Sequence, residues 1–193
     1  MNSQLLTSFL QVNRFINPLT AEEIAAGFIE RTVAKNNYLL EEGKICDTYY
    51  FLEKGFMRGF AHDTNGNDVT TAFYSAGQLV FEASSFFNRT PSKENIQALQ
   101  DCSGCYITYE ELNHLFHSRQ EFREFGRSIL VRGLSSLKTR MLSMITETAE
   151  QRYNTLLKNN PEIFQQAALK HIASYLGITD TSLSRIRKEY SKK

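Results

Sequence analysis

The chain has 193 residues, of which 41% are hydrophobic and 22% charged, and its formal net charge is +1. This length suits one large or two small globular domains, and no stretch approaches the roughly 20 apolar residues that span a membrane, which excludes membrane-spanning classes. The first residues, MNSQLLTSFL, lack the features of a signal peptide, and three cysteines cannot form a complete set of disulfides, so we expect a cytoplasmic protein.

Two short helices are predicted in residues 1–27. The first is indicated by an apolar stripe consisting of Leu5, Leu6, Phe9, Leu10 and Val12. The second is expected to start at Thr20, because Thr20 and the Ala-Glu-Glu that follows it form a good N-terminal box.

Short strands are predicted from Phe28 to Thr108. Alternating or aromatic runs such as TYYFLEKG and FMRGFAHD are separated by turn residues at Gly43, Gly55, Asn65-Gly66-Asn67 and Gly77. Asn-Gly between two alternating runs predicts a β-hairpin. Many short strands at a spacing of roughly ten residues predict a barrel or a sandwich.

A long helix is predicted after a short one over Tyr109–His117. It runs from about Gln120 to Thr146, and its apolar residues recur every three or four positions at Phe122, Phe125, Ile129 or Leu130, Leu134, Leu137, Met141 and Met144. This pattern is close to a heptad seam. A helix of about 26 residues is about 39 Å long, which is longer than a small barrel can cover. We therefore expect a dimerisation helix, the alternative being a stripe that packs on the barrel.

The C-terminal segment has the pattern of a helix-turn-helix. A helix over Ala149–Asn159 ends before Pro161, which cannot continue it. Apolar or small residues then fall at Ile172, Ala173, Leu176, Ile178, Leu183 and Ile186. Gly177 supplies the turn, because glycine adopts positive φ cheaply, and Thr179 can cap the second helix. The alternative is an ordinary helical hairpin.

The charge is distributed unevenly along the chain. Residues 1–118 hold 8 basic and 14 acidic residues, and residues 119–193 hold 14 basic and 7 acidic residues, so their net charges are −6 and +7. A basic second half indicates a polyanionic partner. Because the excess coincides with the helix-turn-helix pattern, we expect that partner to be double-stranded DNA, read by a helix in its major groove.

In order and spacing, these features resemble the Crp/Fnr superfamily of dimeric transcription regulators. The resemblance is carried by Gly43 in YLLEEGK, Gly55 after TYYFLEK, the hairpin at Asn65-Gly66, Gly77 in SAGQL, Glu82 in FEASSFF, ITYEEL at 107–112 and HIASYLGITDTSLSRIRK. The C-terminal segment and the preceding RYNTLLKNNPE look most like the Crp/Fnr-type regulators of Bacteroidetes.

The resemblance implies an α+β fold with three parts. These are a cyclic-nucleotide-binding-like β-roll (jelly roll) with flanking helices over residues 1–118, a dimerisation helix over 119–147, and an all-α helix-turn-helix domain over 148–193. It also implies a homodimer that binds a palindromic DNA site and influences RNA polymerase, with control by a small effector left open. Such proteins usually carry a β-wing after the recognition helix, and we expect it to be absent or truncated here.

The resemblance also assigns roles on the recognition helix. Its first, second and sixth residues, which approach base edges, are Asp180, Thr181 and Arg185. Arg185 can bind guanine O6 and N7 with two hydrogen bonds. Asp180 departs from the common Arg, so we expect a different DNA sequence to be read. Phosphate contacts, which position the protein without reading bases, are expected from Ser182, Ser184 and Lys188.

The effector pocket of the family is only partly matched. Glu82 aligns with the Glu that holds the ribose, but Ser92-Lys93 replaces the Arg-Ser pair that holds the phosphate. Cyclic AMP would therefore lose a charge-assisted pair, and we expect no cyclic-nucleotide cofactor. Arg89 or Lys93 could substitute in principle, so the candidate pocket comprises Glu82, Arg89, Ser92 and Lys93. The simpler expectation is that aromatic side chains, namely Phe81, Phe86 and Phe87, fill this space.

Enzymatic and metal sites are not indicated. Cys102 and Cys105 form a CxxC at a strand turn, and the histidines lack the spacing of zinc ligands, so we expect no metal. No nucleophile elbow, phosphate loop or HExxH is present, so we expect no catalytic residues. The alternative function is a nucleotide or small-molecule sensor whose C-terminal helices bind a protein partner instead of DNA.

Overall fold

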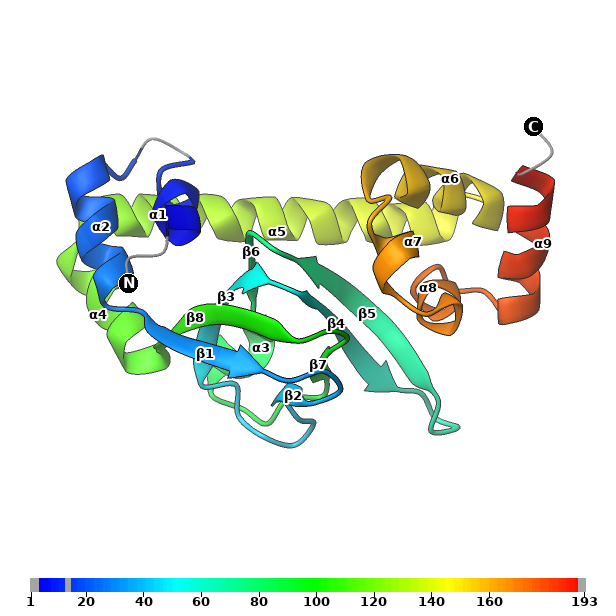
Figure 1. Ribbon diagram of the computed structural model, residues 1–193, viewed down its shortest axis with the longest axis horizontal. Helices are drawn as coiled ribbons and strands as arrows, with labels where there is room; N and C mark the ends of the chain where they lie inside the picture. Colours follow the sequence, from blue (N-terminus) through cyan, green and yellow to red (C-terminus); the bar gives the residue numbers. More distant parts are fainter. Residues whose placement is uncertain (1–3, 13–14, 191–193) are drawn as a thin grey trace.

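The structure is a computed structural model that describes residues 4–12 and 15–190 (Figure 1). Its elements, in chain order, are α1 (Gln4–Leu10), α2 (Pro18–Ala26), β1 (Ile29–Val33), β2 (Tyr38–Leu40), β3 (Thr48–Lys54), β4 (Phe56–His62), β5 (Asp68–Ser75), β6 (Gln78–Val80), α3 (Ala83–Asn88), β7 (Asn95–Ala98), β8 (Cys102–Thr108), α4 (Tyr109–Ser118), α5 (Gln120–Thr146), α6 (Ala149–Asn159), α7 (Ile163–Gln166), α8 (Leu169–Tyr175) and α9 (Asp180–Tyr190).

The strands form the predicted β-roll. They pair in two four-stranded sheets, in the orders β1-β8-β3-β6 and β2-β7-β4-β5, and every described pairing is antiparallel. Side chains from the facing sheets and the flanking helices make one buried apolar core, in which Tyr50, Phe51 and Phe86 are completely buried. Burial of such aromatic surface is the main source of stability for a roll of short strands.

Two turns of the roll depend on their sequence. The predicted hairpin joins β4 to β5, and the Asp63 carboxylate closes its turn by accepting hydrogen bonds from the backbone N–H of Asn65 and of Asn67. Between β3 and β4, Gly55 has a φ of 102°, and a Cβ at this position would lie 2.5 Å from the Cys102 sulfur. Only glycine fits there, because both the conformation and the space exclude a side chain.

The second N-terminal helix begins at Pro18, so the predicted start at Thr20 was wrong. The Asn17 side chain accepts a hydrogen bond from the Thr20 N–H at 3.0 Å and is the true N-cap. Pro18 then occupies the first turn, where a missing N–H costs nothing. The Asn-Pro pair is a stronger start signal than the box two residues later.

The long helix α5 has the bounds predicted for it and runs along the length of the molecule (Figure 1). Its apolar stripe has two parts. Phe122 and Phe125 are buried in the core of the β-roll, and Ile129 packs against that core. Beyond Ile129 the apolar side chains are exposed in the single chain, including Leu134 at 69% and Leu137 at 65%. The first part covers the roll, and the second part is left uncovered.

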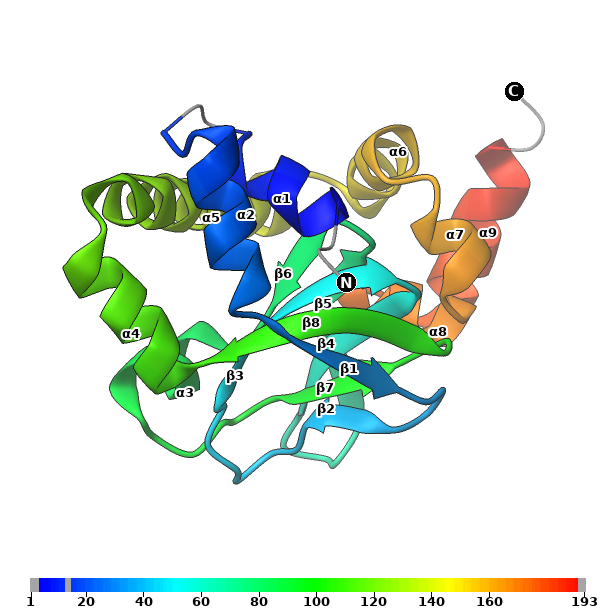
Figure 2. The ribbon, with the colours of Figure 1, turned by 60° about the vertical axis from the view of Figure 1, so that its left-hand side comes forward.

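The C-terminal helices form a helix-turn-helix around a second apolar core. Every residue predicted for its two helices is buried, namely Ile172, Ala173, Leu176, Leu183 and Ile186. Gly177 has a φ of 67°, and the Thr179 hydroxyl accepts a hydrogen bond from the Ser182 N–H at 3.2 Å, as expected for a turn and an N-cap. Figure 2 shows these helices at the opposite end of the roll from α2 and α4.

The division into domains at residues 118 and 147 stays a prediction. The C-terminal core also contains Phe56 of β4, so the helix-turn-helix contacts the β-roll directly. The described residues contain no strand after β8, and none of their helices combines the length and apolar character needed to cross a membrane.

Candidate nucleic-acid interface

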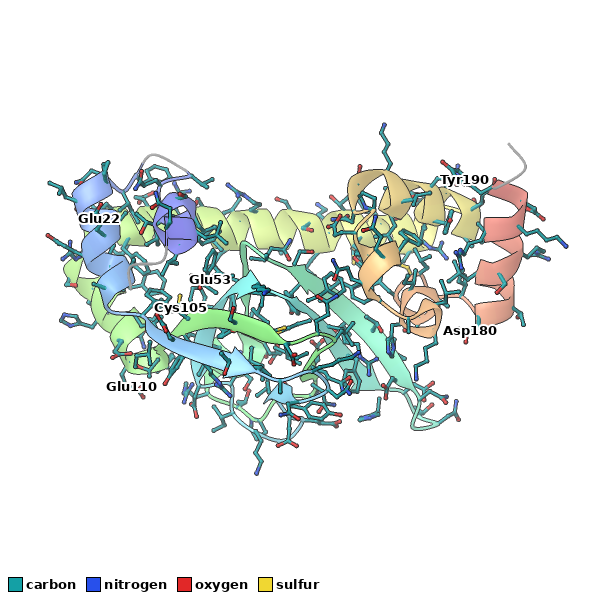
Figure 3. The ribbon with its side chains drawn as sticks, viewed as in Figure 1. Glu22, Glu53, Cys105, Glu110, Asp180 and Tyr190 are labelled. Atoms are coloured by element: carbon teal, nitrogen blue, oxygen red, sulfur yellow. The ribbon has the colours of Figure 1, made fainter. Side chains whose placement is uncertain are left out.

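Helix α9 lies at one end of the molecule, with Asp180 at its start and Tyr190 at its end (Figure 3). Leu183 and Ile186 are buried against the rest of the helix-turn-helix. Five of the six predicted base and phosphate contacts are exposed on the opposite side of α9, namely Asp180, Thr181, Ser184, Arg185 and Lys188. Counted from Asp180, the other four lie one, four, five and eight positions further on, which places all five on one continuous helical face. The structure therefore brings five of the six predicted DNA-contact residues together.

Ser182 lies at the edge of this face and is half-buried. Its hydroxyl accepts a hydrogen bond from the Thr179 hydroxyl at 3.0 Å, and Thr181 and Thr179 share another at 2.9 Å. These two predicted contacts thus also take part in the cap of α9. To contact a phosphate, the Ser182 hydroxyl must donate to it while keeping, or after giving up, the hydrogen bond that it accepts from Thr179.

The electrostatics of the exposed face suit an anionic partner. Among the described residues, neither Arg185 nor Lys188 forms an ion pair, so both cations can meet an incoming phosphate or base. Asp180 lies in the first turn of α9, where a carboxylate interacts favourably with the positive end of the helix dipole. Its charge therefore has a structural role besides any contact with a base.

The four predicted effector residues have separate partners. Glu82 caps α3, and its carboxylate accepts from the backbone N–H of Ser84 at 3.0 Å and of Ser85 at 2.6 Å. Arg89 forms an ion pair with Asp47 and donates to the Cys46 carbonyl at 3.0 Å. Both charged groups therefore have partners within the β-roll and help to hold its loops in place.

Ser92 and Lys93, the other two predicted effector residues, do not share the partners of Glu82 and Arg89. Ser92 is buried, and its hydroxyl donates to the Glu94 carbonyl at 2.8 Å, whereas Lys93 is exposed. None of the four residues lines either of the two β-roll cavities described below. Their assignment to an effector pocket stays a prediction.

Glu94, which directly follows Lys93, is a half-buried carboxylate that the sequence analysis did not consider. Its carboxylate accepts a hydrogen bond from the Thr71 hydroxyl at 3.1 Å, and burial, with a smaller contribution from the Glu82 charge, raises its pKa. The carboxylate therefore links the segment before β7 to β5.

Aromatic rings near the start of α3 form a cluster. The centroids of Phe86 and Phe87 are 5.2 Å apart, and those of Phe81 and Phe86 are 5.8 Å apart. Phe81 also lies 4.6 Å from Tyr49. Rings at such separations attract one another beyond the effect of burial. The three phenylalanines pack together, and the expectation that they fill the effector space stays a prediction.

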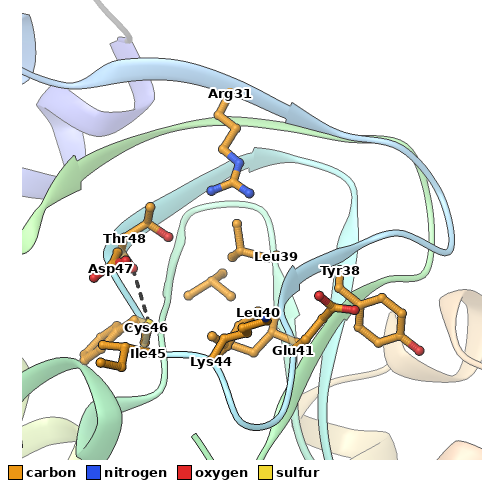
Figure 4. Close-up of a pocket in the computed structure, with 13 residues that line it drawn as sticks. Arg31, Tyr38, Leu39, Leu40, Glu41, Lys44, Ile45, Cys46, Asp47 and Thr48 are labelled. Atoms are coloured by element: carbon orange, nitrogen blue, oxygen red, sulfur yellow. Dashed lines mark hydrogen bonds between the residues drawn. The ribbon is translucent and has the colours of Figure 1, made fainter. Parts of the chain in front are cut away.

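Two of the cavities at the β-roll are lined in part by Phe81. One has a volume of about 280 Å³ and lies under the Arg31 side chain, which reaches from β1 toward Leu39 and Leu40 (Figure 4). The other, of about 650 Å³, separates the roll from α5 and is lined by apolar residues of both, including Phe73, Phe81, Leu130 and Leu134. Arg31 gave no recognisable signal in the sequence, because a single Arg in a strand is usually an exposed residue.

The cysteines show no features of a reactive site. Cys46, Cys102 and Cys105 are all buried and free, and burial raises the pKa of each thiol, that of Cys105 to about 12. Within the described ranges, no three His, Cys, Asp or Glu side chains are grouped so that they could hold a metal ion.

Comparison with known proteins supports the interpretation of the fold. The cyclic nucleotide-binding domain family matches residues 30–119, which span the β-roll. The transcriptional activator protein Anr of Pseudomonas protegens is 24% identical over 167 residues, covering 81% of this chain and 68% of its own length. The fumarate and nitrate reduction regulatory protein of Vibrio cholerae is 24% identical over 174 residues, with coverages of 84% and 69%.

The chain is thus similar in sequence to regulators of the Crp/Fnr type, at 24% identity to both relatives. Solved structures show that it shares their fold. FixK2 from Bradyrhizobium japonicum superposes with a TM-score of 0.71 at 19% identity, over 86% of this chain and 85% of that one. A Crp/Fnr-family regulator from Eubacterium rectale gives the same TM-score at 14% identity, over 95% and 88%. The Crp/Fnr fold therefore extends through the helix-turn-helix, and the Bacteroidetes branch stays a prediction.

Proposed function

We propose that this chain is a Crp/Fnr-type homodimeric transcription regulator that reads a palindromic DNA site with α9. The observation that carries the proposal is the relation between two surfaces on one chain. The uncovered apolar stripe lies on α5, and the exposed polar and basic face of α9 lies beyond the C-terminal end of that helix. A dimer paired along α5 would place both recognition helices at one end.

The exposed stripe supports pairing through residues 119–147. Its members are Leu130, Leu134, Leu137, Met141 and Met144, and their three- and four-residue steps match a coiled-coil seam. Helices with such a seam bury it against a second copy, and two-fold pairing uses the same residues on both chains. Residues 1–118 are then the sensor domain, and residues 148–193 the DNA-binding domain.

The proposed DNA contacts follow from the exposed face of α9. Arg185 reads a guanine through two hydrogen bonds, and Asp180 and Thr181 approach neighbouring base edges. Ser182, Ser184 and Lys188 bind phosphates and fix the register of the helix. The two half-sites lie one helical turn, about 34 Å, apart. RNA polymerase is the protein partner that the family assignment suggests.

The sensor is proposed to work without cyclic AMP. The phosphate-binding Arg is replaced by Ser92, and the neighbouring Glu94 adds a carboxylate. The buried, unpaired cysteines fit the reducing cytoplasm. The protein-binding alternative is not favoured, because the curated relatives named above are transcription regulators.

The test is selection of duplexes from a random-sequence pool, without added ligand, by wild type, Arg185→Ala and Lys188→Ala. Wild type should enrich a palindrome. Arg185→Ala should lose about 1–3 kcal/mol of discrimination at one base pair of each half-site. Lys188→Ala should weaken all sequences alike and lower the salt slope by about one. Failure of wild type to enrich a palindrome, or a uniform loss with Arg185→Ala, would contradict the proposal.

A further inference from the structure

The first helix of the helix-turn-helix is held against the β-roll of its own chain. Helix α8 lies beside β5, and the contact pairs residues that are more than 100 positions apart. We call this contact the α8–sheet interface and define it by Arg58, Thr70 and Phe73 of the sheet and His171, Ser174 and Tyr175 of α8.

Arg58 is the centre of this interface. It is only 4% exposed, although it carries a charge. Its guanidinium donates to Asp68 at 2.6 Å, to Gln97 at 3.1 and 3.2 Å, and to Nδ1 of His171 at 2.8 Å. Asp68 and Gln97 belong to the same sheet as Arg58, whereas His171 belongs to α8. The bond to His171 therefore joins the sensor to the DNA-binding domain.

The bond requires a neutral imidazole. Arg58 can only donate, so Nδ1 of His171 must be the unprotonated nitrogen that accepts. Burial and the Arg58 charge both lower the pKa of His171, to about 4. At neutral pH the acceptor is therefore present. Removing it would leave a buried N–H of a charged group without its partner, which the fold tolerates poorly.

Further contacts fix α8 along its length. The Ser174 hydroxyl donates to the Thr70 hydroxyl at 2.9 Å and accepts from the Thr70 N–H at 3.1 Å. The rings of Phe73 and Tyr175 lie 5.2 Å apart. Arg140 of α5 donates to the Tyr175 carbonyl and to the carbonyls of the adjoining strand. Because α9 packs on α8 through the second apolar core, α9 cannot rotate independently while these contacts hold.

We propose that Arg58 and His171 are positioning residues for DNA recognition, which fix the helix-turn-helix on the sensor sheet and so set the separation of the two recognition helices without any ligand. This inference rests on the proposed function. The docked arrangement leaves the polar face of α9 exposed, so it presents that face to DNA. A rigidly held pair of binding modules gains affinity only from sites with the matching spacing.

The test compares His171→Leu with His171→Asn. Leu removes the acceptor and keeps an apolar side chain, whereas the Asn carbonyl oxygen can replace Nδ1 as the acceptor for Arg58. For each variant, affinity is measured for the selected palindrome, for the same palindrome with two base pairs inserted between its half-sites, and for a single half-site. Exchange of the exposed His117 of α4 for Leu is the matched control.

Wild type, His171→Asn and the His117 control should prefer the selected spacing by about tenfold or more. His171→Leu should reduce that preference to about threefold or less and keep its half-site affinity, because α9 itself is unchanged. If His171→Leu does not fold, His171→Ala, which also lacks an acceptor, takes its place.

An unchanged spacing preference in the variant that lacks the acceptor would overturn the inference. A loss in His171→Asn as large as that in His171→Leu would also overturn it, since the acceptor would then not matter. Both results differ from a failure of the proposed function, in which wild type itself selects no palindrome.

Discussion

The buried His171 predicts how the stability of the chain depends on acidity. The pKa of His171 is lowered from 6.5 to about 4 in the fold, so the unfolded chain binds more protons than the folded chain between these values. Stability contributed by the neutral imidazole is complete above pH 6.5 and is lost as pH falls toward 4. A shift of this size corresponds to about 3 kcal/mol, since each pKa unit is worth about 1.4 kcal/mol.

The charges that face His171 explain the direction of the shift. Arg58 from β4 and the neighbouring Lys170 oppose protonation, whereas Asp68 from β5 and Asp180 of α9 favour it less strongly. Burial makes the largest contribution, because the residue is only 9% exposed and a charged imidazole would lose its hydration. The net effect keeps the ring neutral.

The assay is urea unfolding of wild type and His171→Asn at intervals from pH 7 to pH 4. Asn does not titrate, and the other ionisable groups are the same in both chains. The difference in unfolding free energy between them should therefore shift by about 2–3 kcal/mol in favour of the Asn variant as the pH falls. Parallel stability curves would refute the reasoning, because they would mean that His171 titrates alike in both states.

Three further predictions concern the dimer, the turn and the sensor. Leu137→Glu places a charge in the exposed seam and should yield monomers in analytical ultracentrifugation. Leu19→Glu, at a similarly exposed site on α2, should leave the dimer intact. Dimers in both variants would refute pairing through α5. Gly177 has a φ of 67°, and the Cβ added by Gly177→Ala would lie 2.5 Å from the terminal methyl of Met144, so this change should cost about 1–2 kcal/mol in thermal unfolding. Gly133→Ala, at a helical site with open space, should instead gain up to about 1 kcal/mol. Equal effects of the two changes would contradict the turn geometry. Cyclic AMP at about 1 mM should leave the melting temperature unchanged, because Ser92 stands where the phosphate-binding Arg would be. A ligand present at 100 times its Kd would add about 2.7 kcal/mol of stability, so a clear rise would show that the roll still binds the nucleotide.

Local signals explain how well the elements were predicted. The bounds of α5 and α6 could be predicted because both junctions carry local signals. Thr148 forms a capping box with Gln151 at the start of α6, and Pro161 prevents α6 from continuing. The turn at Gly177 and the hairpin at Gly66 followed from residues that tolerate positive φ. The predicted start of α2 was wrong because two cap signals lie three residues apart and the stronger one, Asn17-Pro18, was passed over.

Partners that are distant in the sequence could not be predicted in this way. Arg58 and His171 are 113 positions apart, and neither stands out in its own segment. The partner of Arg89 is likewise set by the roll, which brings Asp47 to it across 42 positions. The exposed face of α9, by contrast, follows from helical periodicity alone, so five of its six predicted residues were found together.

The central claim is that two copies of this chain, joined through α5, present two α9 helices to one palindrome. Sedimentation velocity of the ligand-free chain, alone and with the selected duplex, tests it most directly. The account predicts a dimer in the absence of DNA and a complex of two protomers on each duplex. A monomer, or a complex with one protomer on each duplex, would contradict it.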